Sequence, residues 1–426
     1  QEKKIFTVQG PYPIIRSLLR ARGWVERKLP GAGRVGSRPE KHRGRQEKQL
    51  QEEKEEEEGE RWDEDPDGIH DVMSHLVRDQ VPYFIWTNRH SAVDRRLLRQ
   101  DQVVNHYARV GAFTTKEGLC LNLRNLPWFD QADPDTFFPR CYRLGAVDER
   151  QAFIEDFRLT AARSLLKVAL ERAGDVPAGT EQPPKSGEGP GEHVGTVTPG
   201  GRAPPTSPQL VEEALQVCEQ HLGSLGHQDI DRDPPSPRMT GTDWDRFLRD
   251  CYRVAHIFGT KFDVRQWFLV TSWNPLTVWF YRESYLRFCS RPFSLRRLDP
   301  ARHLCNVSIQ KQCGPLQAYL AQGGRADAWH QVMVPGMKAA VVGALRSAQD
   351  LVGSRKGSFE LYGADFIFGE DCQPWLLEIN ASPTMAPSSA VTGRLCASVQ
   401  RDTLRVVIDH RDDPTCPTGR FALIYK

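Results

Sequence analysis

Three oxygen-bearing side chains near the C-terminal end of the chain have types and spacing that suit metal and phosphate chemistry. Two runs rich in strand-forming residues, 359–368 and 375–380, flank a short polar turn, and this pattern predicts a β-hairpin. A regular hairpin with this turn places Asp365 directly opposite Glu378. Asn380, two residues further on, then points to the same face of the hairpin as Glu378.

The expected pairing of Asp365 with Glu378 has a chemical consequence. Two carboxylates that face each other repel, so we expect a cation between them, and the hard oxygen donors of this set suit Mg²⁺. The alternative is a solvent-facing strand on which the charges are only tolerated. The same register pairs Ile367 with Leu376, and a slip of one residue would separate the two carboxylates.

A second run, residues 259–270, alternates so that Lys261, Asp263 and Arg265 share one face of a predicted strand. The next predicted strand is 277–281. A row of charges like this can be a ladder on the protein surface, and for an isolated strand that is the commoner explanation. Beside the carboxylate hairpin it favours a cradle for phosphate and carboxylate groups, because a guanidinium binds such anions with two parallel hydrogen bonds.

The candidate residues lie in the last of the ordered blocks that the sequence predicts. Residues 241–426 contain the hairpin and the basic strand, and residues 1–29 together with 68–172 form a predicted N-terminal subdomain. Composition separates these blocks. The charged insert 30–67 cannot support a core, and residues 173–240 form a linker rich in Pro, Gly, Ser and Thr.

Local patterns predict the elements that position these blocks. A strand at 4–8 precedes an amphipathic helix that begins near residue 12 and ends at Gly23. The apolar run 82–86 predicts a buried strand, and a helix is expected at 95–110. One further helix is expected at 210–222, inside the linker. The strand–helix–strand start indicates a mixed α/β (α+β) protein.

Charge and cysteine usage exclude several classes of protein. The 426 residues carry a formal net charge of +2, and no RNA-binding signature accompanies the tryptophans, so we expect no nucleic-acid partner. Ten cysteines without a C-x-x-C pair fit reduced thiols in a cytosolic protein better than a disulfide framework or a zinc site. No apolar stretch has membrane-spanning length and none resembles a signal peptide, so we expect no membrane association.

Four short motifs occur in the order seen in the tubulin tyrosine ligase-like family, and together they resemble that family far more specifically than any one alone. They are Lys261–Arg265, Tyr281–Arg287, His303–Gln310, and Asp365 followed by Leu377–Asn380. The N-terminal runs Val8–Pro13, Asn105–Tyr107, Thr114–Leu119 and Phe137–Gly145 resemble the glycine-ligating members. The resemblance covers both ends of the chain and leaves out the insert and the linker.

The resemblance implies a mixed α/β fold of the ATP-grasp type, with an N-terminal, a central and a C-terminal antiparallel-sheet subdomain. It implies a ligase that uses ATP and Mg²⁺ to activate a carboxylate as an acyl phosphate, which an amine then attacks. For the glycine-ligating members, the carboxylate is a glutamate side chain on a tubulin tail and the amine is free glycine. We therefore expect a monomeric enzyme of the cytoplasm and cytoskeleton that acts on acidic C-terminal tails of tubulin in microtubules, cilia and axonemes.

The resemblance also assigns roles to side chains by position. The expected ATP-binding set, whose last three members are also the expected magnesium ligands, is Lys116, Lys261, Asp263, Asp365, Glu378 and Asn380. Arg265 and Arg287 resemble the residues that hold the acceptor glutamate and stabilise its reacting carboxyl group. With Glu378 they form the expected catalytic set. Acyl-phosphate chemistry needs a metal and fixed cations where negative charge develops, which agrees with these residue types.

One part of the family pattern is absent from the chain. The central subdomain should lie between residues 252–256 and 257–260, where it normally supplies a strand ending in Lys-Pro and a glycine-rich phosphate loop. Here His256 is followed directly by Ile257, and no Lys-Pro dipeptide occurs in the chain. The join resembles an internal deletion that leaves the central subdomain incomplete. We expect nucleotide affinity to fall, and the alternative is a catalytically inactive form that binds tubulin tails without ligation.

Overall fold

The computed structural model describes ten ranges of the chain: 4–28, 68–174, 207–225, 239–254, 260–295, 297–305, 313–314, 320, 325–387 and 389–426. The predicted insert 30–67 and most of the predicted linker 173–240 lie outside the described residues. The chain divides into two compact units. We call residues 1–140, 261–290 and 304–426 the sheet unit, and residues 141–260 and 291–303 the helical unit. The division at residue 140 falls inside the predicted subdomain 68–172, and the predicted domain boundaries stay a prediction.

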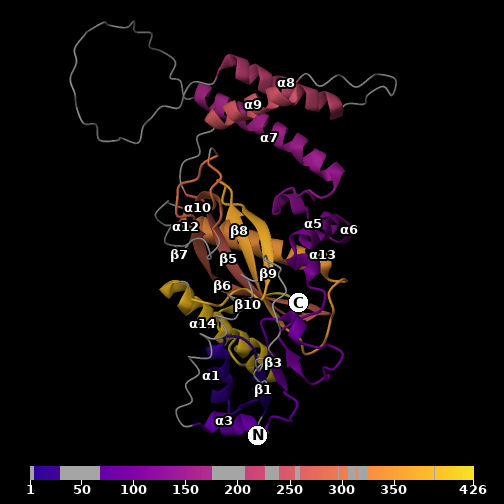
Figure 1. The fold of residues 1–426 in the computed structure, drawn as a ribbon, viewed down its shortest axis with the longest axis vertical. Helices are drawn as coiled ribbons and strands as arrows, with labels where there is room; N and C mark the ends of the chain where they lie inside the picture. The colour runs from indigo at the N-terminus through magenta and orange to yellow at the C-terminus, as the bar shows by residue number, and fades with distance from the viewer. Residues whose placement is uncertain are drawn as a thin grey trace, which may run out of the picture. The chain divides into compact units, whose positions relative to one another are not determined.

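A six-stranded antiparallel sheet forms the centre of the sheet unit (Figure 1). Its strand order is β10-β6-β5-β8-β9, and β7 pairs with β6. The strands are β5 (Phe262–Trp273), β6 (Leu276–Phe288), β7 (Cys313–Gly314), β8 (Glu360–Phe368), β9 (Pro374–Ala381) and β10 (Phe421–Tyr425). Most residues of β5 and β8 are buried, as expected for inner strands that are covered on both faces.

A smaller parallel sheet in the same unit has the strand order β2-β1-β3-β4. Its strands are β1 (Ile5–Val8), β2 (Val25–Glu26), β3 (Phe84–Trp86) and β4 (Val103–Val104). Helix α1 (Pro13–Ala21) joins β1 to β2, and it starts with the proline that the first helical position favours. The predicted strands at 4–8 and 82–86 and the predicted first helix are confirmed.

The helix predicted at 95–110 is wrong. That segment follows the short η1 turn (His90–Ala92), consists mainly of turns, and contains β4. Val103 and Val104 are buried, β4 pairs in parallel with β3, and Val104 also forms a bridge to Ser358. Burial and strand pairing with distant residues therefore override a local helical pattern here.

Helices cover the two faces of the central sheet. Helix α13 (Val334–Ala348) packs against β9 and the short helices α4, α5 and α6, and α14 (Ala390–Leu404) packs against β6 and α1. The remaining helices of the unit are α3 (Ile69–Leu76), α4 (Gly111–Thr114), α5 (Lys116–Arg124), α6 (Leu126–Phe129), η2 (Pro134–Thr136), α12 (Ala326–Ala328), η3 (Trp329–Met333) and η4 (Arg405–His410).

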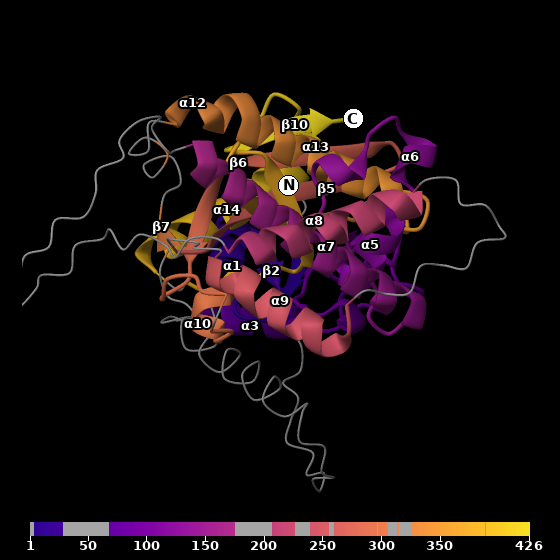
Figure 2. The ribbon, with the colours of Figure 1, turned by 90° about the horizontal axis from the view of Figure 1, so that it is seen from above.

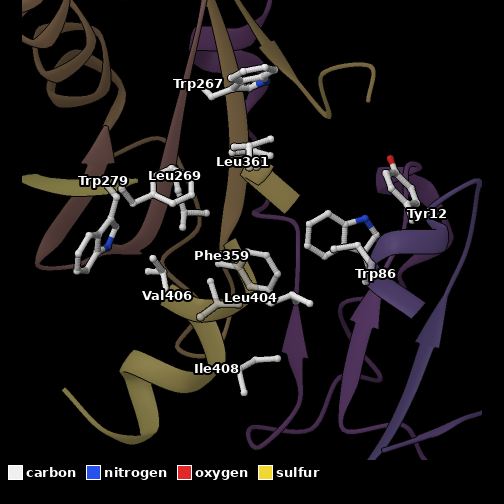
Figure 3. Close-up of a cluster of buried hydrophobic side chains, with 14 of the residues drawn as sticks. Tyr12, Trp86, Trp267, Leu269, Trp279, Phe359, Leu361, Leu404, Val406 and Ile408 are labelled. Carbon is white, nitrogen blue, oxygen red and sulfur yellow. The ribbon is translucent and has the colours of Figure 1, made fainter. Parts of the chain in front are cut away.

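One hydrophobic cluster joins the small sheet to the central sheet (Figure 3). At its centre Phe359 lies 5.8 Å from the ring of Phe84 and 5.7 Å from that of Trp86. Leu404 and Val406 reach the same cluster from α14 and η4. Aromatic pairs of this kind add about 0.5–1.5 kcal/mol beyond the apolar area that they bury. The two sheets therefore share one core.

The helical unit contains three long helices, which lie side by side in Figures 1 and 2. They are α7 (Val147–Gly174), α8 (Pro208–Leu225) and α9 (Gly241–Val254), and the short α10 (Pro300–His303) belongs to the same unit. Their core residues recur at helical spacing, as in Phe247, Cys251 and Val254 of α9. The helix predicted at 210–222 is confirmed. Within the described ranges, no helix is long and apolar enough to cross a membrane.

We expect Phe359→Ala to lower the free energy of unfolding by about 3–5 kcal/mol, because it removes an aromatic ring from the shared core and leaves a cavity. Urea denaturation measures this change. The control is Trp128→Ala, whose side chain is exposed and whose loss should cost within about 0.5 kcal/mol. Equal effects of the two substitutions would show that the two sheets do not share a core.

Candidate active site on the carboxylate hairpin

The hairpin of β8 and β9 has the predicted pairing at its functional residues. Asp365 lies opposite Glu378, and Asn380 lies opposite Gly363. The register shifts after Asp365, so that Leu377 has no partner, and the predicted pair of Ile367 with residue 376 is wrong, because Ile367 faces Trp375. A β-bulge of this type bends the strand and is common beside functional sites, where it re-aims a side chain.

The sheet register brings Arg265 and Arg287 to Asp365. Arg265 is the partner of Asp365 in the pairing of β5 with β8, and Arg287 is the partner of Asp263 in the pairing of β5 with β6. Arg265 donates from Nε to Oδ1 of Asp365 at 2.5 Å and from a terminal nitrogen to Oδ2 at 3.1 Å. Arg287 reaches Oδ2 of Asp365 at 2.9 Å and donates from Nε to Oδ1 of Asp263 at 2.5 Å.

This cluster of four charges is almost completely buried, and Asp365 is only 3% exposed. Burial raises the pKa of Asp365, but Arg265 and Arg287 outweigh the burial and hold that pKa below its ordinary value. Burial lowers the pKa of Arg287, yet Asp365 and Asp263 raise it above its ordinary value. Asp365 is therefore a carboxylate and both arginines are cations at neutral pH.

Glu378 has an environment of its own at the more open side of the hairpin. Its side chain is 28% exposed and pairs with Lys116, the first residue of α5. The helix dipole disfavours a lysine at a helix N-terminus. The ion pair with Glu378 offsets this cost for Lys116. Each carboxylate thus has side-chain cations of its own, two arginines on Asp365 and a lysine on Glu378, and the cation expected between them stays a prediction.

The donor set nevertheless fits Mg²⁺. Asn380 lies between the carboxylates, with Nδ2 at 3.4 Å from Oδ2 of Asp365 and 3.2 Å from Oε1 of Glu378. A turn of this amide would direct Oδ1 to the same place and complete three oxygen donors. Each carboxylate oxygen has two lone pairs, so Asp365 can bind its arginines and a metal at once. The exposure of Glu378 leaves room for the waters that Mg²⁺ retains.

Lys261 directly precedes β5, and its carbonyl accepts a hydrogen bond from the backbone of Cys289 at 2.9 Å. This bond continues the ladder between β5 and β6, so strand alternation places the Lys261 side chain on the same face as Asp263 and Arg265. The structure therefore places the predicted site residues of β5, β6, β8 and β9 on one face of the sheet, with Lys261 just before β5, and Lys116 contacts Glu378 from α5.

Two residues of the site were missed in the sequence. Gly363 lies under Arg265, where a Cβ atom would meet Cδ of Arg265 at 2.9 Å, and a glycine inside a strand is the signal that indicates such an approach. Tyr285 faces Arg265 from β6 and is buried, and burial raises its pKa to about 12. Tyr285 lies within a predicted motif, but an aromatic residue in a strand does not by itself indicate a site.

The chain is similar to several known proteins. A family model described as the tubulin-tyrosine ligase family matches residues 255–415. Tubulin monoglycylase TTLL3 of Mus musculus is 44% identical over 556 residues, covering 100% of this chain and 59% of the relative. Its Danio rerio counterpart is 42% identical over 542 residues, covering 100% of this chain and 69% of the relative. Protein monoglycylase TTLL8 of Mus musculus is 38% identical over 539 residues, covering 100% of this chain and 64% of the relative.

These alignments also show a difference in length. The chain spans 59% of the first relative, about three fifths of its length. The alignment with that relative has 556 positions against 426 residues in this chain, so about 130 aligned positions of the relative have no counterpart here.

We expect Asp365→Asn to lower the free energy of unfolding by about 3–5 kcal/mol, because it leaves Arg265 and Arg287 buried without their shared counter-charge. Glu378→Gln should cost about 1 kcal/mol or less, because its partner Lys116 is well exposed. Urea denaturation of both variants measures the difference. If the two substitutions destabilise the protein equally, the buried arginines do not depend on Asp365.

We expect Gly363→Ala to cost about 1–3 kcal/mol, because the added methyl group collides with Arg265 and forces it from its place. Gly111→Ala is the control, since a Cβ there makes only an ordinary contact at 3.7 Å with Thr115. Thermal unfolding compares the two. A neutral Gly363→Ala would contradict the close approach of Arg265 to β8.

Proposed function

The chain belongs to the tubulin-tyrosine ligase family, in its glycine-ligating branch, and from this premise we propose that it ligates glycine to glutamate side chains of tubulin tails with ATP. The acceptor carboxylate takes the terminal phosphoryl group of ATP, and ADP leaves. The amino nitrogen of glycine then attacks the acyl carbon, an amide bond forms, and phosphate leaves. The overall reaction is the formation of a protein–glycine amide bond.

The observation that carries this proposal is the pairing of Asp365 with Glu378 beside two buried arginines. Asp365, Glu378 and Asn380 would hold Mg²⁺, which supplies charge stabilisation at the phosphoryl oxygens when it is bound. Lys116 is well exposed beside Glu378, so it can move from that carboxylate to a phosphate. Lys261, just before β5, and Asp263, within β5, would contact the nucleotide.

Arg265 and Arg287 would bind and orient the acceptor carboxylate. Among the described residues, their bonds to Asp365 and Asp263 use Nε and one terminal nitrogen of each guanidinium. The other terminal nitrogen of each arginine remains for a substrate anion. Because Asp365 and Asp263 fix both guanidinium groups in advance, little reorganisation is needed when negative charge develops on the reacting carboxyl group.

The same proposal includes the partners and the place of action. Tubulin and microtubules are the proposed protein partners through their acidic tails, and free glycine is the small substrate. We propose a monomer that acts in the cytoplasm at the cytoskeleton, including cilia and axonemes. Similarity to the tubulin monoglycylases of Mus musculus and Danio rerio supports tubulin as a substrate and association with the cytoskeleton.

A second candidate function is binding of tubulin tails without ligation. The observation that favours it is the deficit of about 130 aligned positions, which supports a chain with an incomplete central subdomain. The predicted join between His256 and Ile257 lies outside the described residues. In this case Arg265 and Arg287 would still bind an acidic tail, whereas the ATP site would lack the part that the central subdomain normally contributes.

We expect the purified chain to incorporate labelled glycine into tubulin in the presence of MgATP. Glu378→Gln should lower the rate by about 100-fold or more, because metal binding stabilises the transition state by several kcal/mol. Glu370→Gln, at the exposed turn of the same hairpin, is the matched control and should keep the rate. Mass spectrometry of the tubulin tails identifies the modified glutamate.

Titration of MgATP by calorimetry separates the two candidates. Binding that Glu378→Gln abolishes supports the ligase. A folded protein that binds tail peptides but neither binds MgATP nor incorporates glycine would contradict the ligase and support the tail-binding form.

A further inference from the structure

A second polar cluster lies at the other end of β8, away from the hairpin site. His90 of η1, His106 after β4 and Glu360 at the start of β8 bring their ligand atoms within 4.8 Å of one another. Glu360 and Asp365 are five residues apart on a regular strand, so they lie about 16 Å apart and on opposite faces of the sheet. The cluster is therefore independent of the proposed Mg²⁺ site.

The hydrogen bonds of His106 indicate which of its two ring nitrogens carries a proton. Nε2 lies 2.8 Å from the carbonyl of Thr87, and because a carbonyl can only accept, Nε2 carries a proton. Nδ1 lies 3.0 Å from Oε1 of Glu360. In the neutral ring Nδ1 presents a lone pair, which would face an anionic oxygen unless a positive charge lies between them.

The ring of His90 lies beside that of His106 and faces the same oxygen of Glu360. Its Nε2 lies 2.9 Å from Oε1 of Glu360 and has no other partner among the described residues. The rings of His90 and His106 have their centroids only 4.0 Å apart. The three ligand atoms of His90, His106 and Glu360 therefore lie close enough together for one ion to contact all of them.

The rest of the carboxylate is already held in place. The other oxygen, Oε2, accepts from the backbone of Tyr107 at 2.9 Å and from the hydroxyl of Tyr362 at 2.8 Å. These bonds direct Oε1 toward the two histidines, and the bond from His106 to Thr87 fixes the orientation of that ring. Orientation of ligands by a surrounding shell of hydrogen bonds is typical of metal sites.

We propose that Nε2 of His90, Nδ1 of His106 and Oε1 of Glu360 bind a Zn²⁺ ion. One divalent cation satisfies all three lone pairs at once, and two imidazole nitrogens with one carboxylate are a donor set that zinc accepts and magnesium does not favour. Bonds of about 2.0–2.1 Å in a tetrahedral site separate neighbouring ligand atoms by about 3.3 Å. The two nitrogens lie 2.9 Å and 3.0 Å from Oε1 of Glu360, so each needs to move away from that oxygen by only a few tenths of an ångström.

The proposed zinc ion would join two parts of the sheet unit. His90 and His106 belong to the segments around β3 and β4 of the small sheet, whereas Glu360 begins β8 of the central sheet. The His90 side chain is 32% exposed, so a metal ion can enter from that side and a water molecule can complete four-coordination. The site would stabilise the junction of the two sheets rather than act in the ligation.

The test is zinc binding by the full chain after removal of metals with a chelator. We expect one Zn²⁺ per chain by elemental mass spectrometry, a rise in the melting temperature on adding zinc, and a visible absorption band of four-coordinate Co²⁺ in the cobalt form. His90→Ala should weaken zinc binding by about 100-fold or more and abolish the rise in melting temperature, because loss of a ligand exceeds the loss of a supporting residue. Glu360→Gln should weaken binding in the same way.

Two controls separate this site from other donors in the chain. His75→Ala removes an exposed histidine of α3, and Cys289→Ser breaks the pair of buried thiols in which Sγ of Cys289 and Cys305 lie 3.4 Å apart. Both variants should bind zinc as the unchanged protein does. The proposal is overturned if the folded protein takes up no zinc, or if zinc uptake survives His90→Ala and is lost in Cys289→Ser. His90 is partly exposed, so its alanine variant should fold and keep the test decisive.

Discussion

The carboxylate of Asp365, shared by two guanidinium groups inside the sheet, is the interaction on which the candidate site depends. Arg265 and Arg287 are buried, and a buried cation without a partner is strongly destabilising. The shared carboxylate provides both arginines with a counter-charge and fixes the positions of their guanidinium groups. The Asp365 carboxylate therefore stabilises the buried arginines and, in the proposed function, also holds them in position to bind an anion. Gly363 belongs to the same arrangement, since only a residue without a side chain leaves room for Arg265.

This arrangement sets a condition on substrate binding. In the proposed ligase, an incoming carboxylate or phosphate would share the arginines with Asp365, and a metal ion would share Asp365 with the arginines. Both are possible because each carboxylate oxygen has two lone pairs and each arginine has a further nitrogen. Glu378 and Lys116 are the more exposed pair, so in the proposed ligase they are the groups that would separate on binding of MgATP. Asp365 and its two arginines are thus preorganised, whereas Glu378 and Lys116 can change partners.

The hairpin could be predicted because strand alternation and a short turn determine which side chains face each other. The bulge at Leu377 could not, since one additional residue leaves the local pattern of apolar and polar residues almost unchanged. The two arginines on Asp365 also escaped prediction, because the order of β6, β5 and β8 in the sheet is a property of the whole fold. The same reason explains the wrong helix at 95–110, where Val103 and Val104 pair with distant strands. The cluster around Glu360 combines residues from three separate segments, and no local spacing brings them together.

The most direct test of the central claim is a crystal structure of the chain with Mn²⁺ and a non-hydrolysable ATP analogue, with anomalous scattering to locate the metal. The account predicts a metal peak within bonding distance of the Asp365 and Glu378 oxygens, with the amide of Asn380 turned so that its oxygen faces the metal. Arg265 and Arg287 should keep their bonds to Asp365. A nucleotide-bound structure with the metal elsewhere, or with Lys116 still on Glu378 and no metal at the hairpin, would contradict the assignment of this hairpin as the magnesium and ATP site.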